Sequence, residues 1–456
     1  MSHQRKLRSD VDMTQGSVAG HLIRFAIPLL AGNLFQQFYN MVDTWVVGNF
    51  VSNEAFSAVG SVGPIVNMLI GFFTGLANGA GVVISQYYGA KREEEVRKAV
   101  HTAMSMTLIL GILFTALGIG ITPFMLRFMK TPDNVMPESS TYLTIYFGGI
   151  LGLMIYNMGA GILRAVGDSK RPFYFLVVCA LLNVILDLVF VLGFGMGVDG
   201  VAWATVLSQA VSAFLVVLSL LRADNWIRLR LLRLRLHWDI LKKIVSIGIP
   251  AALQFAITAF SNVFVQSYIN YFGADCMSGW TAYTKIDQLL LLPMQSIALA
   301  TTTFVGQNHG SGQAKRAKSS VRIAAGLSML CTATLILAII YPFAPYLVSF
   351  FNSKDAVVEY GKLFLYWISP FYLLSCISQV YACGLRGAGN TKASMVIMLC
   401  SFVGFRQLYL FIMANFISNT VLPIAMAYPA GWFVAAMSTL IYYRFTDFEK
   451  YNIVKV

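Results

Sequence analysis

The chain has 456 residues, of which 57% are apolar and only 12% charged, and its mean hydropathy is +0.68. Ordinary soluble domains carry about 25% charged residues, so this composition excludes a soluble protein, which would expose far too much apolar surface. The net charge of +13 does not indicate a nucleic-acid-binding protein, because the basic residues lie in short segments between apolar runs rather than in one patch.

Apolar runs of about 20 residues, long enough to cross a bilayer as a helix, recur along the whole chain. The polar start is too long to be the n-region of a cleaved signal peptide, so we interpret the first apolar run as the first span. We predict twelve spans, at 22–47, 56–86, 97–122, 140–163, 172–194, 200–221, 246–271, 278–305, 320–345, 360–385, 393–415 and 420–443.

Lys and Arg are distributed unevenly over the segments that connect these spans. With the N-terminus inside, 27 of the 33 lie in inside segments and 4 in outside segments, while Lys285 and Arg406 fall within spans. Positively charged residues accumulate in cytoplasmic loops, so we expect both termini to be cytoplasmic.

The first predicted span carries a polar stripe. Asn33, Gln36, Asn40 and Asp43 recur at spacings of three and four, so they share one helix face, which must line a cavity or contact another helix. An ionisable side chain within hydrocarbon indicates function more than it indicates a packing seam, which is the alternative. Pro28 interrupts the helical hydrogen bonds of the same span, which makes a bend or hinge there plausible.

The following spans add oxygen-bearing side chains. Asp187 follows Asn183 by four residues in the fifth span, while Asn157 in the fourth span and Thr205 in the sixth are equally compatible with plain helix contacts. A carboxylate removed from water can exchange a proton near neutral pH, and hard cations prefer oxygen ligands. These residues therefore suit a proton site or a sodium site, the latter at Asp43, Asn183, Asp187 and Thr205.

The second half of the chain repeats the first. LRAVGDSK at 163–170 and LRGAGNTK at 385–392 share Leu, Arg, Gly and Lys, and the same offset of 222 residues places Pro28 on Pro250. We interpret the shared motif as a structural turn on the cytoplasmic side, in which Gly167 permits a left-handed conformation or a tight turn, and Asp168 and Ser169 can cap the next helix.

The repeat predicts an all-α polytopic membrane protein of 12 helices in two six-helix lobes, related by a pseudo-twofold axis along the membrane normal. The expected parts are a cytoplasmic N-terminal segment at 1–19, the N-lobe at 20–222, a basic linker at 223–241, the C-lobe at 242–444 and a cytoplasmic tail at 445–456.

The repeat keeps its scaffold but not its acidic residues. Val265 takes the place of Asp43, while Phe405 and Tyr409 take the places of Asn183 and Asp187. We therefore assign ion coupling to the N-terminal half alone. The remaining polar candidates either line a substrate cleft or have a structural role; they are Gln36, Asn40, Gln254, Lys285, Asp287 and Arg406. A further alternative for Arg406 is an ion pair with Asp287.

The sequence resembles the multidrug and toxic compound extrusion (MATE) family over nearly its whole length. The resemblance rests on AIPLLAGNLFQQFYNMVDTWVVG in the first span, on the repeated turn and on NVILDLVFVLG in the fifth span, and the DinF-like bacterial branch looks most similar. It implies that Asp43, Asn157, Asn183, Asp187 and Thr205 form an acidic N-lobe site and that Pro28 is a hinge. The absence of acids from the seventh and tenth spans departs from the sodium-coupled branch.

We therefore expect a secondary antiporter of the bacterial cytoplasmic (inner) membrane that exports cationic or amphipathic organic compounds in exchange for H⁺ or Na⁺ by alternating access. It would need no cofactor beyond the coupling ion, and its partners would be small organic substrates and membrane lipids, with no nucleic acid, in a monomer. A lipid-linked precursor flippase of the same superfamily is the alternative. A channel or a membrane enzyme is a further class, but the sequence has no catalytic Ser/His/Asp set, metal cluster or nucleotide loop.

Overall fold

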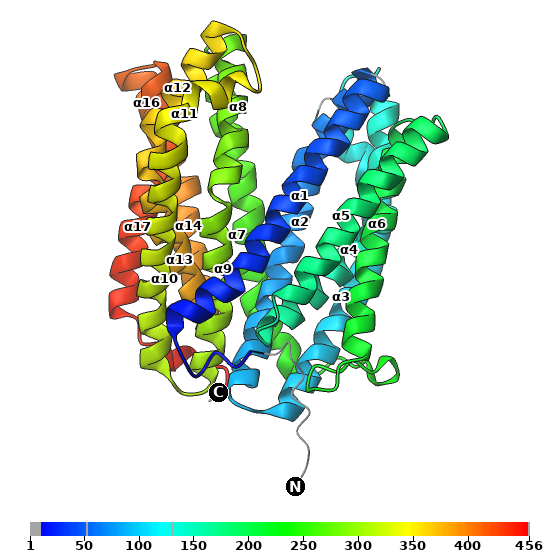
Figure 1. The fold of residues 1–456 in the computed structure, drawn as a ribbon, viewed down its shortest axis with the longest axis vertical. Coiled ribbons are helices and arrows are strands. Elements are labelled where there is room, and N and C mark those ends of the chain that lie inside the picture. The colour runs from blue at the N-terminus through cyan, green and yellow to red at the C-terminus, as the bar shows by residue number, and fades with distance from the viewer. Residues whose placement is uncertain (1–10, 52, 130, 455–456) are drawn as a thin grey trace. The chain divides into compact units, whose positions relative to one another are not determined.

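The computed structural model describes residues 11–51, 53–129 and 131–454, and this part of the chain is helical without any strand (Figure 1). Within it, eleven helices are long and apolar enough to cross a membrane, and a bent pair of shorter helices forms a twelfth candidate span. The predicted all-α membrane fold is confirmed. The predicted segments 1–19 and 445–456 lie partly outside the described residues.

Two compact units divide the chain, and each is described by itself. The first comprises residues from Ala31 to Ile249, and the second comprises Met13–Leu30 together with the chain from Pro250 onward. The helices that begin each half belong to both units: α1, Val18–Phe50, changes unit after Leu30, and α7, Trp238–Asn270, changes unit after Ile249. Both changes of unit therefore fall next to the prolines that the repeat aligns, Pro28 and Pro250.

Among its described residues, unit 1 also contains five further α-helices, a short π-helical turn and a 3₁₀ turn. Their bounds are α2 Asn53–Gly89, α3 Glu93–Phe128, α4 Met136–Ala165, α5 Lys170–Leu188, η1 Val189–Gly193, α6 Val198–Leu221 and η2 Leu231–Arg233. The central helix is α4, which packs against α2, α3 and α6. Gly149, Gly152 and Gly159 of α4 let it approach α6 so closely that a methyl group on Gly149 would lie 2.3 Å from Val206. Small residues are what close helix contacts in a membrane require.

Unit 2 is built from shorter helical segments. Their bounds are α8 Ala274–Leu290, α9 Leu292–Gly310, α10 Ala314–Leu335, η3 Ile336–Ile340, α11 Tyr341–Ser349, α12 Asp355–Ile368, η4 Ser369–Phe371, α13 Tyr372–Gly387, α14 Thr391–Leu399, η5 Cys400–Phe405, α15 Arg406–Ile412, η6 Met413–Ile417, α16 Val421–Ala425, α17 Ala427–Phe445 and η7 Phe448–Tyr451. Here α13 takes the central position, against α9, α10 and α17. The repeat aligns α13 with the second half of α4.

The predicted span 278–305 is a bent pair rather than one straight helix. α8 ends at Leu290, α9 begins at Leu292, and the two axes differ by 42°. Pro293 causes the break, because proline has no N–H for a helical hydrogen bond and restricts the residue before it.

The repeated turn has the predicted backbone. Gly167 has φ +88° and Gly389 has φ +99°, both in the left-handed region. The cap differs from the prediction in one detail. Asp168 Oδ1 accepts from the backbone N–H groups of Lys170 and Arg171, whereas Ser169 makes no side-chain capping bond. A carboxylate one residue further from the helix reaches both N–H groups, which a serine hydroxyl cannot.

Candidate functional site

Two carboxyl groups meet inside unit 1. Asp43 lies on α1 and Asp187 on α5, and their side chains are within hydrogen-bonding reach of each other. The helical spacing of four residues places Asn183 on the same face of α5 as Asp187. Asn183 and Asp187 are 1% and 0% exposed. The structure therefore brings together three of the five residues that were predicted to form the ion site.

The polar atoms of this group are not satisfied by the protein. Within the described residues, Oδ1 of Asp43, both carboxyl oxygens of Asp187 and both amide atoms of Asn183 are buried and have no hydrogen-bond donor or acceptor. A buried polar group without a partner costs roughly 1–3 kcal/mol, and more if it is charged. Two facing carboxylates also repel each other, so they favour a shared proton or a cation held between their oxygens.

Tyrosines from α4 and α1 surround the carboxyl pair. Tyr142 lies beside both acids, and its hydroxyl is within hydrogen-bonding reach of Thr205 on α6. Thr205 Oγ1 donates to the carbonyl of Val201, so the same oxygen can accept from Tyr142. Tyr146 stacks on Tyr142 with ring centroids 6.3 Å apart. The sequence analysis missed both tyrosines, although their spacing of four residues places them on one face of α4.

The other residues predicted from the first half of the chain are not part of the unsatisfied group. Asn157 uses its amide to donate to the carbonyl of Leu153 in its own helix, at 2.9 Å, and no described hydrogen bond joins it to either acid. Gln36 is within hydrogen-bonding reach of Tyr39, which lies close to Asp43. Asn40 is exposed on α1. Pro28 lies inside the continuous helix α1.

Unit 2 contains a buried arginine whose guanidinium is well bound. Arg406 is 3% exposed, and its Nη2 donates to Ser261 Oγ and to Asn262 Oδ1, both at 2.9 Å. Its guanidinium carbon also lies 4.9 Å from the centroid of the Tyr428 ring, which is a cation–π distance. Ser261 in turn donates to the carbonyl of Phe402. This arrangement ties α7 to the irregular helix that contains Arg406.

The remaining ionisable residues of unit 2 lie apart from Arg406. The Asp287 carboxylate accepts from the hydroxyl of Tyr283 at 3.5 Å, and Lys285 is exposed. Asp287 and Arg406 form no ion pair among the described residues, so the predicted alternative of an Asp287–Arg406 pair is not what the structure contains. Gln254 on α7 is 5% exposed and leaves its buried Oε1 without a partner.

These positions bear on the flippase alternative, which needs free basic groups within the membrane. Nη2 of Arg406 is already bound to Ser261 and Asn262, and Lys285 is exposed on its unit. The described residues also contain no group of three or more His, Cys, Asp or Glu side chains that could hold a metal ion. The unsatisfied Asp43–Asn183–Asp187 group is therefore the strongest candidate site.

Comparison with known proteins gives a consistent result. The MatE family model matches residues 28–189 and 250–412, which are two copies of one pattern at the offset of the internal repeat. Two curated Bacillus subtilis proteins match nearly the full length. "Probable multidrug resistance protein YoeA" is 29% identical over 92% of each chain, and "Probable multidrug resistance protein YpnP" is 30% identical over 95% of this chain and 96% of its own.

Solved structures show the same fold at lower sequence identity. A MOP superfamily transporter from Pyrococcus furiosus superposes with a TM-score of 0.90 over 98% of both chains, at 22% identity. An outward-facing multidrug resistance MATE family transporter superposes with a TM-score of 0.89 over 95% of this chain and 97% of its own, at 23% identity.

Proposed function

The chain belongs to the MatE family of transporters, and from this premise we propose that it is a secondary antiporter that exports cationic or amphipathic organic compounds in exchange for H⁺ or Na⁺. The observation that carries the proposal is the pair of facing carboxyls, Asp43 and Asp187, which has no basic partner among the described residues. The names of the Bacillus relatives support multidrug export as the class of activity.

The coupling follows from the charge of the pair. The site loses its attraction for an organic cation when its negative charge is neutralised. A bound proton can do this, and so can a sodium ion held between the oxygens of Asp43, Asp187 and Asn183. When neither carboxylate has bound a proton or a sodium ion, the pair attracts an organic cation, and leaving the charged site empty is energetically unfavourable. Ion and substrate thus compete for one negative site, which is the minimum requirement for exchange. Thr205 and Tyr142 supply adjacent hydroxyl groups, and Asn157 remains a proposed member of the site.

The conformational step is assigned to α1. Pro28 has no N–H to bond with the carbonyl of Arg24, so the helix is weakest at this turn. The change of unit after Leu30 places the weak turn between the part of α1 that belongs to unit 2 and the part that carries Asp43. A change of charge at Asp43 can therefore be relieved by bending at Pro28. We propose alternating access on this basis.

The distribution of Lys and Arg supports an inner-membrane protein with both termini in the cytoplasm. On that placement residues 20–222 and 242–444 are the two lobes, and 223–241 is a cytoplasmic linker. The acids of the coupling site all come from one chain, so a monomer suffices for exchange. Gln36, Asn40, Gln254, Lys285 and Asp287 remain proposed contacts for the substrate.

The test is efflux from proteoliposomes loaded with a fluorescent organic cation, driven by either a pH gradient or a sodium gradient. Wild-type protein should respond to at least one gradient, and Asp187→Asn should not. Asp355→Asn is the matched control, because it removes a carboxylate from an exposed position at the start of α12 in the other unit and should leave transport intact. Undiminished efflux by Asp187→Asn would refute the assignment of the site, and no efflux under either gradient would refute antiport.

A further inference from the structure

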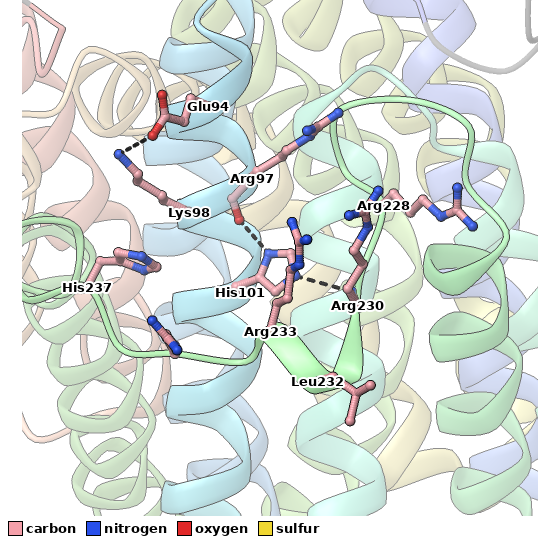
Figure 2. Close-up of a pocket in the computed structure, with 10 residues that line it drawn as sticks. Glu94, Arg97, Lys98, His101, Arg228, Arg230, Leu232, Arg233 and His237 are labelled. Atoms are coloured by element: carbon pink, nitrogen blue, oxygen red, sulfur yellow. Dashed lines mark hydrogen bonds and ion pairs between the residues drawn. The ribbon is translucent and has the colours of Figure 1, made fainter.

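Unit 1 contains a second polar site, a cavity of about 370 Å³ between the start of α3 and the linker that precedes α7 (Figure 2). It lies at helix ends, and its lining residues come from other elements of the fold than Asp43 and Asp187. Its lining residues are Glu94, Arg97, Lys98, His101, Arg228, Arg230, Leu232, Arg233, Arg235 and His237. We call it the linker pocket.

The wall from α3 follows from helical spacing. Glu94, Arg97, Lys98 and His101 are separated by three, four and seven residues, so they lie on one face of the first two turns. Glu93 and Glu94 at the helix start form ion pairs with Arg97 and Lys98. The acidic residues near the pocket are thus already engaged with the basic residues of α3.

The linker is ordered and runs across that face of α3. The backbone N–H of Arg230 donates to His101 Nε2 at 3.1 Å, and His101 Nδ1 lies 2.7 Å from the carbonyl of Arg97, so Nδ1 is the donor in that bond. Figure 2 shows His101 between these two partners. Further along, the N–H of His237 donates to Thr102 Oγ1 at 3.2 Å. These bonds fix both ends of the arginine-rich stretch.

Apolar and basic residues alternate in this part of the linker, and the apolar side chains are buried. Ile227 and Leu229 are buried at 0% and 2% exposure, whereas the neighbouring Arg228 and Arg230 are exposed. Four arginines therefore border the cavity, and none of their side chains forms an ion pair or a hydrogen bond among the described residues; they are Arg228, Arg230, Arg233 and Arg235. This concentration of unpaired guanidinium groups on one cavity is electrostatically costly without an anion. Guanidinium groups match phosphate oxygens in geometry and charge.

Apolar side chains at the rim of the linker pocket favour a lipid phosphate over a soluble phosphate as the ligand. Leu232 lines the cavity and is fully exposed, and Leu231, Leu236 and Trp238 are 55%, 36% and 69% exposed. Exposed leucines beside arginines are unfavourable in water but suit the boundary between headgroups and acyl chains, where tryptophan is also enriched. A soluble phosphate would gain nothing from them.

We propose that the linker pocket binds the phosphate headgroup of an anionic phospholipid, with the four linker arginines as ligands and Leu232 against the acyl chains. The pocket goes beyond the transport activity, because it shares no residue with the acidic site. Bound lipid would hold the connection between the two halves of the chain at the membrane surface, where basic residues attract anionic headgroups.

The test compares lipid retention by purified full-length protein in detergent, measured by native mass spectrometry with added phosphatidylglycerol or phosphatidylcholine. Arg230→Gln/Arg233→Gln removes two of the proposed ligands. Lys315→Gln/Arg322→Gln is the matched control, because it removes the same charge from exposed residues of α10 in unit 2. The expected loss of phosphatidylglycerol affinity in the pocket variant is about 30-fold, with little change in the control.

Two further comparisons distinguish a lipid site from a site for free phosphate and from diffuse surface charge. Inorganic phosphate is titrated against wild type by thermal shift, and tighter binding of free phosphate than of phosphatidylglycerol would overturn the lipid assignment. Equal losses in the pocket variant and the control, or no preference over phosphatidylcholine, would show diffuse surface charge and overturn the site. If the pocket variant does not fold, Arg228→Gln/Arg235→Gln replaces it, since both side chains are exposed.

Discussion

In unit 1 Asp187 faces Asp43 and no described donor reaches either of its oxygens, whereas in unit 2 the corresponding residue, Tyr409, donates its hydroxyl to the carbonyl of Pro423 at 3.1 Å. Unit 2 instead has Arg406 at the start of α15, and Nη2 of its guanidinium is held by Ser261 and Asn262. The scaffold is repeated, but the facing acids of one copy have no partner among the described residues, whereas the arginine of the other copy has two hydrogen-bond acceptors. An unsatisfied buried charge is available for a ligand, and a satisfied one stabilises the fold.

The largest expected effect is at the carboxyl pair. Asp43→Asn and Asp187→Asn should each lower gradient-driven efflux by about 100-fold, because either change removes the negative charge that ion and substrate share. The double variant should be no worse than the singles, since the two side chains act as one unit. Efflux assays on all three variants, with thermal unfolding as the folding control, measure this coupling. Additive losses would mean that the two acids act separately.

Arg406→Gln should have the opposite profile. It removes the guanidinium from Ser261 and Asn262 and should lower the free energy of unfolding by about 3 kcal/mol, because it breaks a buried hydrogen-bonded charge. Transport per folded molecule should stay close to wild type. Thermal unfolding in detergent and efflux normalised to folded protein give the two values. A stable variant that has lost transport would place Arg406 in the substrate path instead.

A smaller loss of stability is expected at the contact of α2 with the first part of α7. A methyl group on Gly79 would lie 2.4 Å from the Cα of Gly248, so Gly79→Ala should destabilise unit 1 by roughly 2 kcal/mol. Gly60→Ala in the same helix is the control, since nothing lies within 4 Å of its added methyl. Equal melting temperatures for the two variants would contradict this packing of α7 within unit 1.

The smallest expected effect concerns the prolines of α1 and α7. Pro28→Ala restores the missing helical hydrogen bond and should slow efflux by about 3-fold through a stiffer α1. Pro250→Ala makes the same change in α7, which has no acid after Pro250, and should alter efflux less. Initial rates of efflux under the same gradient compare the two. A larger defect in Pro250→Ala would move the hinge to α7.

Several parts of this comparison could be predicted from the sequence. The three- and four-residue spacing of Asn33, Gln36, Asn40 and Asp43 gives their common face, and Asn183 and Asp187 follow the same rule, because helical geometry fixes neighbours within one helix. The meeting of Asp43 with Asp187 depends on how α1 packs against α5, which no spacing within either helix determines. The residue types alone suggest that such oxygens could share one ion, and the family resemblance implies the same grouping.

Other features gave weaker signals. Tyr142 and Tyr146 read as apolar residues of a span, because an aromatic ring does not reveal whether its hydroxyl faces a carboxyl group. The bonds of Arg406 to Ser261 and Asn262 join helices that are 144 or more residues apart in sequence. In the linker, the many basic residues predict a cytoplasmic connection, but the burial of Ile227 and Leu229 beside exposed arginines is visible only in the structure.

The most direct test of the coupling site is the number of ions released when substrate binds. Tetraphenylphosphonium is titrated into detergent-solubilised protein in weakly buffered solution, and released protons or sodium ions are counted for wild type and Asp187→Asn. The account predicts that wild type releases about one cation per substrate bound, as competition for one site requires, and that Asp187→Asn releases none. Equal release from both proteins would show that the ion binds elsewhere and would contradict the assignment to the Asp43–Asp187 pair.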